Sequence, residues 1–189
     1  MDELKIDIDK IGKGSDSYEI AESCASPFNR CISRVINNGF NKIKELKKDP
    51  NIDEFVRKQE TIDSFERLRN ILSITRAEAP YYTIARSFPN IIKAGEYINN
   101  RNSDHFLKRN YDEMIKNDGN KNMIYDVIRI VSKCFERLSE DEKDEVWELA
   151  SIMLIASIEF HRHLKKTGLF YGQDKKYHYV PEYDYLRKN

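Results

Sequence analysis

The stretch from Ser139 to Thr167 constrains the fold of this chain more than any other part of the sequence. Its middle, from Leu149 to Phe160, carries apolar side chains around the whole circumference of a helix, interrupted mainly by small serines. A helix that is apolar on all sides belongs in the centre of a bundle. A membrane span is the alternative, but a span takes about 20 unbroken apolar residues. Because this run is shorter and charged at both ends, we expect it to lie in a protein core.

Both ends of this helix carry clear sequence signals. Ser139 and Glu142 have the spacing of a capping box, and acidic side chains follow in the first turn, where the helix dipole favours them. Lysines and histidines crowd the last turns, and Gly168 is suited to a left-handed C-terminal cap. The sequence therefore predicts a helix from Ser139 to Thr167, followed by Gly168 as its cap.

Further helices are expected along the rest of the chain. Ser26 and Pro27 have the pattern of an N-cap followed by proline at the first helical position, and Pro80 ends the next helix. Pro89 is expected to open a helix, and Ser103 to cap another. The expected helices cover residues 27–48, 52–79, 89–98, 103–117, 123–138 and 139–167. The sequence thus predicts an all-α fold, a single-domain bundle of about six helices around a long central C-terminal helix.

The two ends of the chain are expected to differ from the bundle. The sequence does not decide whether residues 1–25 are ordered. The stretch Gly12-Lys13-Gly14-Ser15 is expected to be a hinge, because it lacks the spacing of a phosphate-binding loop. Residues 26–168 are expected to form the helical bundle. Residues 169–189 form a tyrosine-rich tail, which can either dock on protein or stack on unpaired bases, and docking is the favoured reading.

Charge and cysteine content narrow the class of protein. The 32 basic side chains balance the 32 acidic ones, so no global field draws in nucleic acid or an anionic membrane. The charge is nevertheless unevenly distributed, because residues 27–48 and 67–116 are basic. Three cysteines without close pairing suit free thiols in a reducing compartment. The acidic start resembles no signal peptide, and we expect a cytoplasmic protein without a membrane segment.

Enzyme chemistry has little support in the sequence. His161 and His163 are two residues apart on a helix, which points their rings to opposite sides and prevents them from sharing a metal ion. Glu159 and His163 share a face, but no second pair completes a dimetal site. Cys134 falls on an apolar stripe and is expected in the core. We therefore expect no catalytic residues, no metal and no cofactor.

Three short motifs carry a resemblance to a known family. The segment Arg67-Leu-Arg-Asn-Ile-Leu-Ser73, the step Lys93-Ala-Gly-Glu96, and the helix Ile155–His161 leading to Phe170-Tyr-Gly-Gln-Asp174 occur in this order. In this they resemble the small helical subunit of type III-A CRISPR effector complexes. The chain departs from that family at Glu96, where the family has arginine, and in the spacing between the motifs.

The resemblance implies a non-catalytic subunit that stacks along an RNA-guided effector complex. Such a subunit contacts the backbone of the guide–target RNA and touches neighbouring subunits through its helix faces, with self-association possible. Arginine forks suit phosphate oxygens, and an asparagine amide can bond a phosphate or a ribose hydroxyl. The expected RNA-binding residues are Arg67, Arg69, Asn70, Arg76, Lys93 and Arg101.

Two other classes of function stay open. A helical interaction or assembly protein, such as an adaptor or a structural component of a virus or bacterial assembly, agrees with the neutral net charge and the aromatic tail. In that case Arg69 and Asn70 would join helices by hydrogen bonds and Arg67 would be a solvated charge. An enzyme built in a bundle is the weaker third possibility.

Overall fold

The long C-terminal helix is present in the computed structural model as α9, Glu140–Thr167. Its capping box is confirmed, because Glu142 Oε2 accepts a hydrogen bond from Ser139 N at 2.7 Å and Ser139 Oγ accepts one from Glu142 N at 3.3 Å. Most apolar side chains in the middle of α9 are buried, with Ile158 as an exposed exception. The expected central role of this segment in the core is therefore largely realised.

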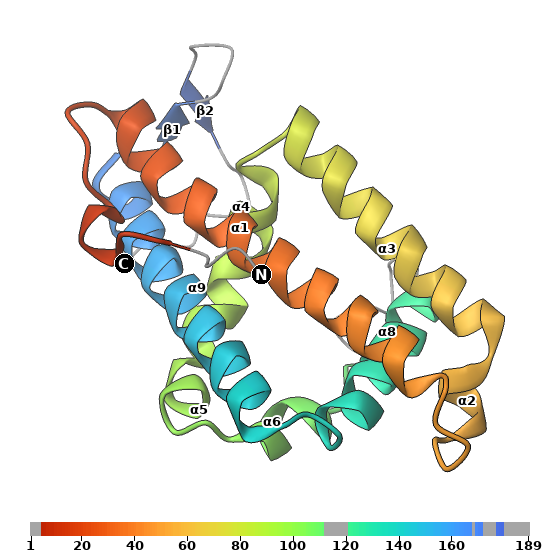
Figure 1. Cartoon of the computed structure of the whole chain (residues 1–189). Helices are drawn as coiled ribbons and strands as arrows, with labels where there is room; N and C mark the ends of the chain where they lie inside the picture. Colours follow the sequence, from red (N-terminus) through yellow and green to blue (C-terminus); the bar gives the residue numbers. More distant parts are fainter. Residues whose placement is uncertain (1–4, 112–120, 168, 172–176, 180–189) are drawn as a thin grey trace. The chain divides into compact units, whose positions relative to one another are not determined.

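The structure describes residues 5–111, 121–167, 169–171 and 177–179 (Figure 1). Within them the chain is all-α apart from one short strand pair, as the sequence predicts. The elements before α9 are η1 Ile8–Lys10, α1 Ser17–Leu46, α2 Glu54–Arg57, α3 Gln59–Glu78, α4 Tyr82–Lys93, α5 Gly95–Asn99, α6 Ser103–Leu107 and α8 Lys121–Phe135. Gly168, expected as the cap of α9, lies outside the described residues.

The first long helix begins earlier than expected. The prediction of a helix start at Ser26 and Pro27 is wrong, because α1 begins at Ser17 and contains Pro27. Asp16 supplies the cap, with its Oδ1 accepting from Glu19 N at 2.9 Å, and Glu19 Oε2 accepts from Ser15 N at 2.7 Å. This Asp-x-x-Glu pattern has the same spacing as the capping box of α9, but the Glu19 carboxylate reaches the amide of Ser15, one residue before the cap, rather than the amide of the cap residue itself.

Two other predicted helix boundaries are corrected. The helix expected over 52–79 is broken at Lys58, whose extended backbone separates α2 from α3. Pro89 does not open a helix but lies inside α4, where Ile84 and Phe88 are buried four residues apart on one face. Packing of that face outweighs the loss of one backbone donor at the proline.

The helix expected from Ser103 is much shorter than predicted. Asn102, rather than Ser103, is the N-cap of α6, and its Oδ1 accepts from His105 N at 3.1 Å. The helix ends at Leu107, and residues 108–111 are not helical. The remainder of that expected helix, together with the expected loop at Asp118–Asn120, lies largely outside the described residues.

The chain groups into two compact units built from non-contiguous segments. Unit 1 consists of the described parts of Met1–Cys31, Thr75–Glu96 and Ala150–Asn189, and unit 2 consists of Ile32–Ile74 and the described parts of Tyr97–Leu149. In unit 1, Phe88 of α4 meets Phe160 of α9 edge to face at 5.9 Å, and both rings are fully buried. The side chains of Cys24 and Cys31 are buried in the same unit.

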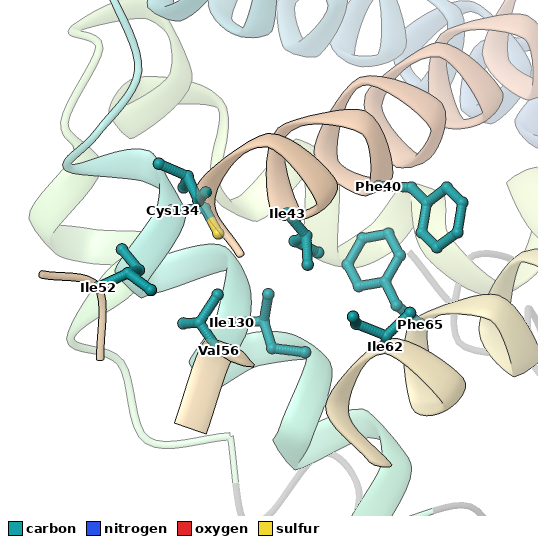
Figure 2. Close-up of a cluster of buried hydrophobic side chains, with 9 residues drawn as sticks. Phe40, Ile43, Ile52, Val56, Ile62, Phe65, Ile130 and Cys134 are labelled. Carbon is teal, nitrogen blue, oxygen red and sulfur yellow. The ribbon is translucent and has the colours of Figure 1, made fainter. Parts of the chain in front are cut away.

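The core of unit 2 joins α1, α2, α3 and α8, as Figure 2 shows. Phe40 and Phe65 stack with their centroids 6.3 Å apart. A Cβ atom added at Gly39 would lie 3.2 Å from Cζ of Phe65, so a side chain there would push the Phe65 ring aside. Cys134 belongs to this core, as its stripe position predicts. The buried members are Phe40, Ile43, Leu46, Ile52, Val56, Ile62, Phe65, Ile130 and Cys134.

A short strand pair follows α9. β1, Leu169–Tyr171, pairs antiparallel with β2, Tyr177–Tyr179, with Phe170 opposite His178. This pairing falls in the tyrosine-rich tail, for which the sequence predicts no strand. Across the described part of the chain, none of the helices has the length and apolar character that crossing a membrane requires.

Candidate functional site

The six predicted RNA-binding residues fall in different parts of the structure. Arg67, Arg69 and Asn70 lie exposed on α3 in unit 2, and Arg101 lies in the turn after α5 of the same unit. Arg76 and Lys93 belong to unit 1. The candidate site is therefore built from unit 2, where four of the six residues lie.

Arg69 forms the best-defined part of this surface together with a residue that the prediction omitted. The Arg69 guanidinium carbon lies 5.4 Å from the centroid of the Phe40 ring, and the Lys44 ammonium lies 4.2 Å from the same centroid. Each contact is a cation–π interaction that favours one position of a long side chain. Two exposed positive groups thus lie beside the buried Phe40 ring, and we call Lys44, Arg69 and Phe40 the basic cluster.

The basic cluster carries positive charge that no carboxylate neutralises within the described residues. Neither Lys44 nor Arg69 forms an ion pair there, although Glu66 precedes Arg69 by only three residues. By contrast, the neighbouring Lys42 is held by Glu142 at 3.2 Å. Two nearby cations without a counter-charge repel each other, and an anion between them relieves that repulsion. The cluster is chemically suited to a phosphate group, since arginine and lysine both donate to phosphate oxygens.

The sequence contained a signal for Lys44. Phe40 and Lys44 are four residues apart, which places them on one face of the helix expected over residues 27–48. That helix also lies in a basic block of the chain. The contact of Arg69 with Phe40 could not be read from the sequence in the same way, because it joins two helices.

Arg67 and Asn70 point to a different side of α3 from Arg69. They are three residues apart, so they share one helix face, whereas Arg67 and Arg69 are separated by about 200° around the helix axis. Ile74 continues the face of Arg67 and Asn70 and is 57% exposed. The three residues Arg67, Asn70 and Ile74 therefore make a mixed polar and apolar face rather than part of the basic cluster.

The other predicted residues have different surroundings. Arg101 is ion-paired with Asp144, so its charge is already compensated, and its backbone has a φ of 50°. Lys93 is exposed at the end of α4. Arg76 is partly buried on α3 and already interacts with another group of the protein. Arg101 therefore differs from Lys44 and Arg69 in that a carboxylate already balances its charge.

Three groups of unit 1, His161, His163 and Cys24, have pKa values that are shifted mainly by burial. Burial lowers the pKa values of His161 and His163, and Lys165 and Lys166 respectively add to the effect. Burial raises the pKa of the Cys24 thiol to about 12, which keeps it protonated and unreactive at neutral pH. Over the described ranges, no three side chains of the metal-ligating types cluster closely enough to hold a metal ion.

Comparison with known proteins adds no relative. No family model, curated protein or solved structure matches this chain.

Proposed function

We propose that this chain is a non-catalytic helical subunit that grips RNA through its phosphate backbone, in a complex of the RNA-guided, type III CRISPR-like kind. The observation that carries the proposal is the basic cluster, in which Lys44 and Arg69 flank Phe40 without a carboxylate partner in the described residues. The motif resemblance that begins at Arg67 supplies the class of complex. The basic cluster supplies a physical contact for it.

Recognition of this kind is independent of base sequence and sensitive to salt. Phosphate contacts position a protein on nucleic acid but carry no sequence information directly. Each neutralised phosphate releases bound counterions, so the affinity falls steeply as the salt concentration rises. A subunit that lies along a guide–target duplex needs this kind of contact, because it must tolerate any guide sequence.

The test is a titration of the purified chain with a guide–target RNA duplex and with single-stranded RNA, at about 50 mM and 150 mM salt. The test variant is Lys44→Ala/Arg69→Ala. We expect it to bind several-fold more weakly and to lose about one to two units of the slope of log affinity against log salt. Circular dichroism verifies that the variant stays folded.

A matched control removes two other exposed positive charges. Lys10 pairs with Asp7 at 3.0 Å and Arg162 pairs with Glu159, so Lys10→Ala/Arg162→Ala changes the net charge by the same amount but removes cations that already have partners. We expect this control to bind RNA as the wild type does. Equal binding by the cluster variant and the wild type would refute the proposed phosphate contact.

The runner-up function, a helical assembly protein without a nucleic-acid role, is favoured by one observation. The exposed Ile74 shares its face of α3 with Arg67 and Asn70, and a mixed face of this kind suits a protein neighbour. Light scattering of the wild type and of Ile74→Asp tests it. Self-association that Ile74→Asp abolishes, together with no RNA binding at low salt, would support this alternative over the RNA-binding proposal.

A further inference from the structure

A pair of stacked aromatic rings lies at the surface of unit 2, away from the basic cluster in the sequence. The Tyr97 ring and the His105 ring are nearly parallel, with an interplanar angle of 6° and centroids 3.5 Å apart. Tyr97 comes from α5 and His105 from α6. Tyr97 is 36% exposed, and the His105 ring covers one of its faces.

The pair is anchored to the interior by a chain of further rings. His105 meets Phe106 edge to face at 5.1 Å, and Phe106 contacts Trp147 at 6.0 Å. Trp147 is nearly buried and packs edge to face on Phe135 at 6.2 Å. Aromatic contacts at these distances stabilise each other in defined orientations. The surface pair is therefore backed by a packed aromatic core, and the Tyr97 ring is held in place before any ligand arrives.

The turn between the two rings is also fixed. Tyr97 O accepts a hydrogen bond from Asn102 N at 2.9 Å, and Asn102 Oδ1 accepts one from His105 N at 3.1 Å. Asn102 thus links the backbone carrying one ring to the backbone carrying the other. A platform held in this way loses little conformational entropy when a flat ligand stacks on it.

Within residues 97–108, the two basic side chains Arg101 and Lys108 are already paired with acids. Arg101 is bonded to Asp144, and Lys108 lies 2.7 Å from Asp104. This segment therefore presents little uncompensated positive charge, in contrast to the basic cluster. A ligand bound at the Tyr97–His105 pair would therefore be recognised by a flat face of the ligand rather than by the charge of the ligand.

We propose that the Tyr97–His105 pair is a stacking platform for an unpaired nucleobase, which lies on the Tyr97 face opposite His105. Every base has a π-face, so stacking on an aromatic side chain is tolerant of sequence. The proposal goes beyond the phosphate contact, since it names a second site in unit 2, with different residues and a different physical basis. The base can belong to a single-stranded RNA or to a free nucleotide, and the experiment separates these two sources.

The experiment uses photo-crosslinking of the full-length chain. One arm uses a single-stranded RNA with one 5-iodouridine, and the other uses the 5′-monophosphate of 5-iodouridine. Mass spectrometry locates the crosslinked residue, and we expect Tyr97 or His105 in the RNA arm. Crosslinking only in the RNA arm assigns the site to a base within a strand, and equal crosslinking in both arms assigns it to a free nucleotide. No crosslink to either ring in either arm overturns the proposal.

Affinity measurements with substitutions provide the second readout. We expect Tyr97→Ala to weaken binding of single-stranded RNA by about 5- to 100-fold, which corresponds to about 1–3 kcal/mol per stacked base. Tyr97→Phe should keep the affinity, and Tyr97→Leu, which keeps bulk without a π-face, should lose it. Tyr82→Ala is the matched control, because Tyr82 is another exposed tyrosine, in α4 of unit 1.

The two proposals fail in different ways. An RNA in which the single contacted nucleotide is abasic should bind the wild type as weakly as the complete RNA binds Tyr97→Ala. The variant Lys44→Ala/Arg69→Ala should still crosslink through Tyr97 at raised RNA concentration. If Tyr97→Ala weakens binding of the abasic RNA as much as it weakens binding of the complete RNA, the ring contacts something other than a base. That result would overturn the platform while leaving the basic cluster intact.

Discussion

Lys42 of α1 and Glu142 of α9 form an ion pair within unit 2, in which the ammonium lies 3.2 Å from each carboxylate oxygen. The Lys42 side chain is only 12% exposed. Although burial opposes its charge, the hydrogen bond and the charge of Glu142 raise the pKa of Lys42. The same carboxylate accepts a hydrogen bond from Ser139 N. One side chain therefore completes the cap of α9 and joins α9 to α1.

Replacement of Glu142 by alanine should destabilise the protein more than replacement of a neighbouring glutamate. The substitution removes half of the capping box and leaves Lys42 without its main partner, so we expect a loss of about 1–3 kcal/mol in the free energy of unfolding. Glu140→Ala is the control, because Glu140 is 87% exposed and its pair with Lys143 lies at the surface, so its loss should stay below about 0.5 kcal/mol. Urea denaturation measures both, and equal losses would contradict the double role.

Glu142 should also contribute to acid sensitivity. The backbone hydrogen bond from Ser139, followed by Lys42, lowers the pKa of Glu142 from 4.5. Because the folded-state pKa lies below the unfolded value, this stabilisation is present above pH 4.5 and is lost as the pH falls through the folded-state pKa. We expect Glu142→Gln to have a shallower loss of stability than the wild type below pH 4.5, measured by thermal unfolding across pH 3 to 6. An unchanged slope would show that Glu142 does not titrate in this way.

The buried His163 of unit 1 should make stability depend on pH in a higher pH range than Glu142 does. Burial lowers the pKa of His163 below 6.5, and Lys166 adds to the effect. The unfolded chain therefore binds the proton more readily, so stability is present above pH 6.5 and declines as the pH falls below it. We expect His163→Leu to reduce the difference in urea midpoint between pH 7.5 and pH 5.5. His105→Gln, a substitution in unit 2, is the control and should leave the contribution of His163 unchanged.

The sequence predicted those structural features that depend on local patterns. The capping box of Ser139 and Glu142 was found because a cap and its partner are three residues apart. Asp16 and Glu19 have the same spacing, but the proline signal at Pro27 predicts a later start of α1 than the structure shows. Local signals compete, and the sequence alone did not rank these two correctly.

Ion pairs between residues far apart in the chain could not be predicted from the sequence. Lys42 and Glu142 are 100 residues apart, and Arg101 and Asp144 are 43 apart. Which basic side chains acquire a carboxylate partner therefore became clear only from the structure. This decides the candidate site, because Arg101 is paired with Asp144 whereas Arg69 and Lys44 form no ion pair in the described parts of the chain.

The core of unit 2 should respond very differently to truncation at two adjacent positions of α8. Ile130 is fully buried in the cluster of Figure 2, and Val131 beside it is 42% exposed. Ile130→Ala should cost about 2–5 kcal/mol, because it removes buried surface and leaves a cavity. Val131→Ala should change the stability by less than about 0.5 kcal/mol. Urea denaturation distinguishes them, and similar losses would place α8 in a different orientation from the one in the structure.

Gly12 should be intolerant of any side chain, and the effect should be confined to the N-terminal segment. Its φ of 73° is unfavourable for other residues, and an added Cβ would lie 2.7 Å from Glu159 Cβ. The left-handed backbone costs about 1–2 kcal/mol in a non-glycine residue, and overpacking adds about 1–3 kcal/mol.

Detachment of the segment around Ile11 relieves the strain that Gly12→Ala introduces. We therefore expect this variant to open the segment while α1 stays folded. The readout is faster hydrogen exchange at the amide of residue 12, which in the wild type donates to Ser23 Oγ at 3.0 Å, and earlier proteolysis within residues 5–15. Lys13→Ala, an exposed neighbouring change, should leave both measurements unaltered. Wild-type exchange in Gly12→Ala would mean that the segment is not held against Glu159 in the way the structure shows.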